Sequence, residues 1–344
     1  MEFIYIAASF FLGVVINLLV IKKYKIFNLY ILLDKEYLKP QSFHRTPVLC
    51  FGGSSLYIIF TILFFLKILD FNFFLLVSSA FFIGLIDDIK IKFKPKFRLI
   101  FIFFLFFIVI CYSNIIIKKT GIDFLDYILK ENKFFNFFFV LLCFVFVING
   151  SNFIDGFNGL LAIHSLIILS IINFINFYFN NDNLLFTGLI FFSCILSFLL
   201  FNFPRAKLFL GDGGSYLIGS LISYLIIETS NYNPNISPFF FSCLLYYLFF
   251  EVFFSFFRKF FYEKKNPLIP DRFHLHMLFF VYRNKKNNLF LANYTTGIYI
   301  NLIYLVSLFP LFLFYNNNYF SKYYFFILLV GYVFFYFKLR KDDK

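Results

Sequence analysis

The sequence has little charge for its length, because Asp, Glu, Lys and Arg make up only 14% of its 344 residues. It contains no Trp and only 2 Met, whereas 61% of its residues are hydrophobic and its mean hydropathy is +0.83. So few charges and so much apolar surface exclude a water-soluble globular protein with a buried core. The composition therefore predicts an integral membrane protein.

Cysteine is scarce too. The 5 Cys are scattered without metal-ligand spacing and mostly lie in apolar runs, so we interpret them as small hydrophobic residues. The 65 Phe and 24 Tyr are interpreted as compositional bias and not as a cofactor-binding motif. The net charge of +13 lies in the predicted loops, which is typical of contact with anionic lipid headgroups and argues against nucleic acid binding.

A helix needs about 17 to 25 apolar residues to cross the hydrocarbon core of a bilayer. The sequence offers eleven candidate runs, some of them short: 3–21, 50–69, 71–86, 99–117, 134–149, 160–179, 184–203, 214–230, 238–257, 296–314 and 320–337. The basic cluster of the first run follows it, the reverse of a cleaved signal peptide, so this run is predicted as a membrane helix. The predicted fold class is all-α, a polytopic membrane protein of ten or eleven transmembrane helices in a single domain, 1–344.

Lysine and arginine are unevenly distributed between the predicted loops. If the N-terminus lies outside, 25 of the 31 basic residues fall in the inward connections and the C-terminal tail. This asymmetry predicts an outside N-terminus and a cytoplasmic C-terminus. Five polar breaks in the apolar pattern then lie on the cytoplasmic side, which predicts one site there: 44–53, 87–88, 149–159, 204–215 and 267–276.

The most unusual break is 149–159, in which Asn149, Asn152, Asp155 and Asn158 recur every three residues. In a helical segment their side chains would share one face. Three glycines in the same stretch allow a ligand or another backbone to come close. A carboxylate at the end of a membrane helix is costly, so it tends to mark a functional site.

Two further breaks carry acidic residues. Asp87 and Asp88 end the third run and precede a Lys-rich segment, whose cations relieve repulsion between adjacent carboxylates and hold phosphate oxygens. Asp212 lies among glycines at the start of a helix, where free backbone amides favour an anion. Its carboxylate suits Mg²⁺, which prefers one or two carboxylates together with phosphate oxygens and water.

The break at 267–276 combines an Asp-Arg pair with His274 and His276, a set that suits a phosphate or a sugar. The two histidines share a face only if the segment is extended. Zinc is poorly supported, because no Cys or third His is close in the sequence. In the break at 44–53, Arg45 is a weaker candidate for a phosphate contact.

Taken in this order, the five breaks resemble the polyprenyl-phosphate N-acetylhexosamine-1-phosphate transferases, or glycosyltransferase family 4. That family includes the undecaprenyl-phosphate N-acetylglucosaminyl-1-phosphate transferases and, more distantly, phospho-N-acetylmuramoyl-pentapeptide transferase. The resemblance spans 44–276, ahead of the predicted terminal helices at 296–337, and its most specific segments are 149–160 and 209–215.

The resemblance implies a multi-pass enzyme of the bacterial cytoplasmic membrane, with its active site facing the cytoplasm. It would transfer a sugar 1-phosphate from a UDP-N-acetylhexosamine, such as UDP-GlcNAc, to undecaprenyl or another polyprenyl phosphate and release UMP. The lipid-linked product starts a cell-envelope glycan, for example a lipopolysaccharide O-antigen. The implied cofactor is Mg²⁺, with Mn²⁺ as a substitute, and a homodimer is compatible with the sequence.

The resemblance also implies roles for individual residues. Catalytic roles fall on Asp87, as the group near the lipid phosphate, on Asp88, which supports it, and on Asp155. Asp212 is the implied Mg²⁺ ligand. Substrate-binding roles fall on a larger set: Asn149, Asn152, Gly156, Arg45, Arg272, His274 and His276.

Two positions depart from the family pattern, because Met277 stands where members often have a further His and Asn158 stands where they have a second acidic residue. These changes weaken any role for the two positions. Two alternatives stay open, namely the muramoyl-pentapeptide transferase and a transporter whose pathway is lined by discontinuous helices. The transporter fits less well, because no internal repeat is found and the acidic residues gather at predicted helix ends.

Overall fold

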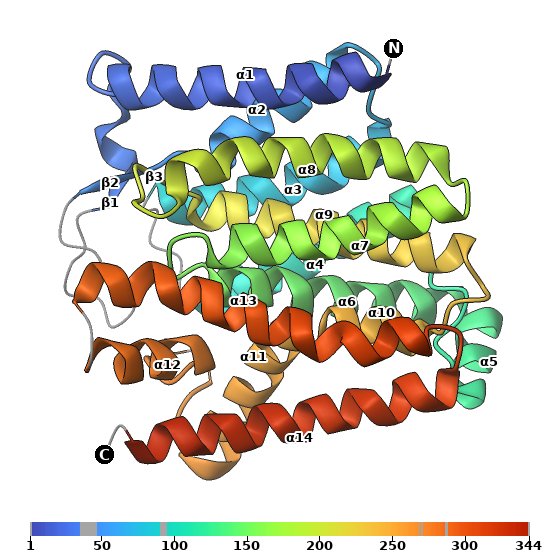
Figure 1. Cartoon of the computed structure of the whole chain (residues 1–344). Coiled ribbons are helices and arrows are strands. Elements are labelled where there is room, and N and C mark those ends of the chain that lie inside the picture. Colours follow the sequence, from blue (N-terminus) through green and yellow to red (C-terminus); the bar gives the residue numbers. More distant parts are fainter. Residues whose placement is uncertain are drawn as a thin grey trace.

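The computed structural model describes residues 2–34, 47–89, 95–267, 269, 271–285 and 288–342. Long helices form a bundle, and the two ends of the chain lie at opposite ends of it (Figure 1). The longer helices are α1 Glu2–Lys23, α2 Gly52–Phe65, α3 Phe71–Asp88, α4 Pro95–Ser113, α6 Lys133–Ile154, α7 Leu160–Tyr178, α8 Asp182–Asn202, α9 Gly211–Tyr232, α11 Tyr246–Phe257, α13 Leu289–Leu313 and α14 Asn318–Asp342. The shorter helices are η1 Leu29–Leu32, α5 Asp123–Glu131, α10 Pro238–Leu244, η2 Arg258–Tyr262 and α12 Leu275–Asn284.

Helices dominate, as predicted for an all-α membrane protein. Among the described residues, seven helices are long and apolar enough to cross a membrane, or eight if α10 and α11 form one bent span. The expected count of eleven is therefore not confirmed, because α2 and the apolar part of α4 are short. Helix α9, which is long but less apolar than these spans, is largely buried and packs against α3 and α6, so it needs little lipid-facing apolar surface.

The expected span at 238–257 is wrong as a single helix. α10 ends at Leu244, α11 begins at Tyr246, and their axes differ by 71°. The break removes the Leu244 carbonyl from the regular helical ladder, and the Tyr304 hydroxyl donates a hydrogen bond of 2.6 Å to it. After the break, α11 runs across the direction of its neighbours (Figure 1).

The sequence also gave no sign of a small sheet at one end of the bundle, the end that holds α12 and the last turn of α14 (Figure 1). Its strands are β1 Leu33–Asp34, β2 Val48–Cys50 and β3 Leu208–Phe209. β1 pairs antiparallel with β2, and β2 pairs parallel with β3. The sheet thereby joins the segment that precedes α2 to the segment that precedes α9.

Helices α3 and α9 approach each other closely near this end. A Cβ atom on Gly84 would lie 2.3 Å from the Asp212 carbonyl oxygen and 2.5 Å from the Gly213 nitrogen. Because backbone atoms cannot move aside as a side-chain tip does, we expect Gly84→Ala to destabilise the protein by about 1 to 3 kcal/mol. Thermal unfolding of the purified protein measures the effect. The control is Gly331→Ala, whose Cβ meets nothing within 4 Å, and equal melting temperatures of the two variants would contradict this reading.

Candidate active site

A cavity of about 800 Å³ lies beside the small sheet. Most of the polar positions predicted for the site line it: Asp87, Asp88, Asn149, Asn152, Asp155, Gly156, Asn158, Asp212 and His274. These residues come from the end of α3, the end of α6, the start of α9 and the segment before α12. The structure therefore brings described residues of all five predicted breaks to one place, since Cys50, from the break at 44–53, lines the cavity too.

Asp88 joins the end of α3 to the start of α9. Its Oδ1 accepts a hydrogen bond of 2.8 Å from the Asp212 backbone N–H, and its Oδ2 accepts one of 2.9 Å from the Gly213 N–H. Gly211, just before them, has a φ of +79°, a left-handed conformation that glycine adopts without strain. These contacts use both oxygens of Asp88 and orient the turn that presents Asp212.

Asn152 contacts the Asp212 side chain. Its Nδ2 donates to Asp212 Oδ1 at 2.8 Å and to Ser215 Oγ at 3.2 Å. The Ser215 hydroxyl in turn donates to the Asp212 carbonyl oxygen at 3.1 Å. The Asp212 carboxylate is thus held at the cavity wall from α6 as well as from its own helix.

The predicted polar strip at 149–159 is helical only in its first part. α6 ends at Ile154, Asp155 is its C-cap, and the residues that follow form a turn. All four polar residues of the strip nevertheless line the same cavity. Asp155 is half-buried in the cavity wall, and desolvation together with the charge of Asp212 raises the pKa of Asp155 to about 7.

Glu251, which sequence reasoning did not identify, lies between the two histidines. Its Oε2 is 2.9 Å from His274 Nδ1, and its Oε1 is 3.5 Å from His276 Nδ1. Oε1 also accepts a hydrogen bond of 3.2 Å from the Leu275 backbone N–H. This carboxylate fixes the orientation of both rings. An acidic residue inside the apolar run 238–257 was the available signal.

The two imidazole rings stack although the segment is not extended throughout, because His276 already belongs to α12. His274 has an extended backbone just before α12 begins, and the rings stack with centroids 5.6 Å apart. Burial lowers the pKa of His276, and the Glu251 carboxylate opposes that change. Only His274 of the pair lines the cavity, whereas His276 lies fully buried behind it.

Two predicted substrate-binding residues stand apart from the rest. Arg272 is exposed and is not among the described residues that line the cavity, and its guanidinium carbon lies 5.8 Å from the centre of the Phe273 ring. Arg45 lies outside the described residues. In the part of the chain that is described, the cation that reaches the cavity is Lys259, a buried residue that the sequence did not distinguish from other loop lysines.

One side of the cavity is apolar. Its wall is built from three helices, α4, α6 and α11, which contribute Leu99, Ile102, Phe103, Leu142, Val145, Phe146, Val252, Phe253, Phe256 and Phe257. Several of these aromatic rings belong to α11, the helix that follows the bend. The cavity therefore joins an acidic, hydrogen-bonding end to a surface suited to a hydrocarbon chain.

The acidic end of the cavity fits Mg²⁺ better than Zn²⁺. Among the described residues, no three His, Cys, Asp or Glu side chains surround a common metal position, as a structural zinc site requires. Mg²⁺ needs no such cluster, because one or two carboxylates together with phosphate oxygens and water satisfy it. Asp212, with Asp87 and Asp155 in the same cavity, matches that requirement.

Comparison with known proteins adds independent information. The sequence model of glycosyl transferase family 4 matches residues 71–230. The undecaprenyl-phosphate alpha-N-acetylglucosaminyl 1-phosphate transferase of Thermotoga maritima is 29% identical over 237 residues, which is 69% of each chain. The protein of the same name from Escherichia coli O157:H7 is 25% identical over 202 residues, 57% of this chain and 54% of that one. The phospho-N-acetylmuramoyl-pentapeptide-transferase of Dictyoglomus turgidum is 39% identical over 93 residues, 26% of this chain and 30% of that one.

The segment matched by the family model contains four of the five acidic residues that line the cavity in the described part of the chain, Asp87, Asp88, Asp155 and Asp212, and leaves out Asp34. The resemblance predicted from the sequence is thereby confirmed, and this chain is similar to the glycosyl transferase family 4 proteins over residues 71–230.

Proposed function

We propose that this protein transfers an N-acetylhexosamine 1-phosphate from a UDP-sugar to undecaprenyl or another polyprenyl phosphate. An oxygen of the lipid phosphate forms a bond to the phosphorus that carries the sugar. The bond from that phosphorus to the oxygen bridging the two phosphates breaks, and UMP leaves with that oxygen. The products are a lipid-linked sugar diphosphate and UMP.

The observation that carries this proposal is the dual character of the cavity. Carboxylates and amides line one end, and apolar side chains of α4, α6 and α11 line the other. A lipid phosphate has the same two parts, a charged head and a hydrocarbon tail. The names of the curated relatives, which describe polyprenyl-phosphate sugar transfer, support the same substrate class.

The reaction brings two anions together, so it needs a cation at the acidic end. We propose that Asp212 holds Mg²⁺, with Mn²⁺ as a substitute, and that the bound ion screens the phosphate charges. Asp87 faces the lipid phosphate, and Asp155 and Asn152 face the diphosphate of the nucleotide. Asp88 acts through the turn that it holds, as a positioning residue.

The distribution of basic residues supports a cavity that opens to the cytoplasm of a bacterial cell, at the inner membrane. UDP-sugars are made in that compartment, and the apolar wall reaches a lipid carrier in the same leaflet. The C-terminus would then lie in the cytoplasm and the N-terminus outside.

Purified protein incubated with radiolabelled UDP-GlcNAc, undecaprenyl phosphate and Mg²⁺ tests the proposal. Lipid-linked label and UMP in equal amounts are expected, and chelation of the metal should stop both. A panel of UDP-sugars, including the UDP-linked muramoyl pentapeptide, identifies the donor. No product from any donor, together with uptake of substrate into vesicles, would favour a transporter.

The histidine pair provides a prediction about binding. His276 is fully buried, its Nδ1 lies 3.3 Å from the Tyr247 hydroxyl, and its ring stacks on that of His274. We expect His276→Ala to raise the KM for the UDP-sugar by about tenfold with a smaller change in kcat, because the ring supports His274 at the cavity wall. Steady-state kinetics measure both constants. An unchanged KM would remove His276 from the binding site.

A further inference from the structure

We infer that the last turns of α14 hold the histidine segment of the active site in place, and that Arg340 is the positioning residue through which they do so. The histidine segment is defined here as residues 271–276. The kinetic part of this inference rests on the proposed function. The inference assigns a positioning role to Arg340, which is far in the sequence from the residues that line the cavity.

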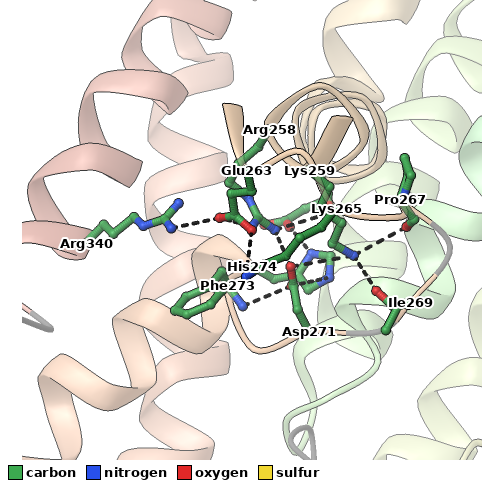
Figure 2. A network of polar contacts seen from close by, with 12 residues as sticks. Arg258, Lys259, Glu263, Lys265, Pro267, Ile269, Asp271, Phe273, His274 and Arg340 are labelled. Carbon is green, nitrogen blue, oxygen red and sulfur yellow. Dashed lines mark hydrogen bonds and ion pairs between the residues drawn. The ribbon is translucent and has the colours of Figure 1, made fainter. Parts of the chain in front are cut away.

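The link is a chain of alternating charges between α14, η2 and the histidine segment (Figure 2). Arg340 Nη2 lies 2.7 Å from Glu263 Oε1, and Arg258 Nη1 lies 2.8 Å from the same oxygen. Arg258 Nη2 then reaches Asp271 Oδ2 at 2.8 Å. Asp271 Oδ1 accepts a hydrogen bond of 3.1 Å from the Phe273 backbone N–H.

Burial distinguishes this network from a surface ion pair. The Arg258 side chain is 2% exposed and that of Glu263 is 8% exposed, and the terminal members Asp271 and Arg340 are 19% and 21% exposed. A buried charge that loses one of its partners is left uncompensated, whereas an exposed pair contributes little. Arg340 therefore stabilises Glu263 beside Arg258, and Arg258 in turn stabilises Asp271.

Arg340 also touches the histidine segment directly. Its guanidinium carbon lies 4.9 Å from the centre of the Phe273 ring, and its Nη1 donates to the Tyr336 hydroxyl at 3.1 Å. Phe273 precedes His274, whose Nε2 is 3.9 Å from Asp271 Oδ1 and whose ring lines the cavity. A shift of Arg340 is thus passed to His274 both through Phe273 and through Asp271.

A basic residue in a C-terminal tail has a simpler use, which is attraction to anionic lipid. That role depends on charge alone, so Lys would replace Arg without loss and the neighbouring Lys341 would matter equally. The contacts described above require the planar guanidinium, which bonds to Glu263 and Tyr336 through separate nitrogens while it covers Phe273.

The test compares Arg340→Gln and Arg340→Lys with the matched control Lys341→Gln, an exposed position on the next residue. Hydrogen exchange of the full-length protein in lipid nanodiscs reports on residues 271–276, and steady-state kinetics report on the UDP-sugar. For Arg340→Gln we expect faster exchange in this segment and a loss of about 10-fold to 100-fold in kcat/KM, mostly through KM. Arg340→Lys is expected to fall between Arg340→Gln and the wild type.

Two results would overturn the inference: exchange in 271–276 that matches the Lys341→Gln control, or full activity of Arg340→Gln at subsaturating UDP-sugar. If Arg340→Gln fails to fold, Arg340→Lys decides, since a value equal to the wild type in both measurements contradicts a guanidinium-specific role. The exchange experiment needs no substrate. It therefore separates a failure of this inference from a failure of the proposed function, which would appear as an inactive wild type.

Discussion

Replacement of Asp212 by Asn is expected to lower turnover by about a thousandfold while leaving the fold intact. The side chains are nearly the same size, and the Asn152 contact to Oδ1 and the Asp88 contact to the backbone N–H of residue 212 do not depend on the lost charge. What disappears is the negative charge that is proposed to hold Mg²⁺ against two phosphates. Formation of lipid-linked product at saturating substrate measures the loss.

Asp182→Asn is the matched control for this experiment. Asp182 lies in the first turn of α8, whereas Asn202, at the other end of that helix, lines the cavity. The length of the helix separates the two by about 30 Å. Ordinary turnover in Asp212→Asn, or an equal loss in Asp182→Asn, would contradict the assignment of the metal to Asp212.

The second large effect is expected from Asp88→Asn. Asp88 accepts one backbone N–H with each carboxylate oxygen, and an amide offers only one oxygen and brings an N–H₂ group against the other donor. The turn that presents Asp212 should then shift, and turnover should fall by about a hundredfold. Because Asp88 is proposed to act by position, the Mg²⁺ concentration for half-maximal activity should rise as well.

Asp70→Asn serves as the comparison, because it is the same substitution on the same helix. Asp70 caps the start of α3, where one of its oxygens accepts from the Asn72 and Phe73 backbone N–H groups. Asn is also a good N-cap, so this variant should keep wild-type activity and Mg²⁺ dependence. If Asp88→Asn behaves in the same way, Asp88 has no positioning role.

Composition and the family motifs predicted much of the fold and most of the acidic residues that meet in the cavity. The long apolar runs did form helices, since crossing a bilayer leaves the backbone few other choices. The acidic breaks lie at neighbouring helix ends, and Asp87, Asp155 and Asp212 do reach one cavity. Their roles in catalysis stay predictions, but the arrangement satisfies the requirement that they meet.

The features that the sequence did not predict depend on contacts between distant segments. Leu244 and Tyr246 lie in an uninterrupted apolar run, yet the helix ends between them, and the Tyr304 hydroxyl, from α13, donates a hydrogen bond to the Leu244 carbonyl. The strands β2 and β3 are too short to show an alternating pattern, and they pair residues far apart in the chain, Leu49 with Leu208. The contact of Glu251 with the histidines was not predicted for the same reason, because its histidine partners follow more than twenty residues later.

The place of α14 bears on how the protein becomes active during its synthesis. The ribosome makes Glu263 well ahead of Arg340, which follows 77 residues later. Glu263 and the histidine segment therefore leave the ribosome before α14, the helix that holds them in place, has been made. A nascent chain would thus insert its acidic motifs first, and the histidine segment at the cavity would lack its Arg340 support until α14 has been made. Activity would then require α14, since a fragment released before this helix is made would carry the carboxylates without the Arg340 contact to Glu263.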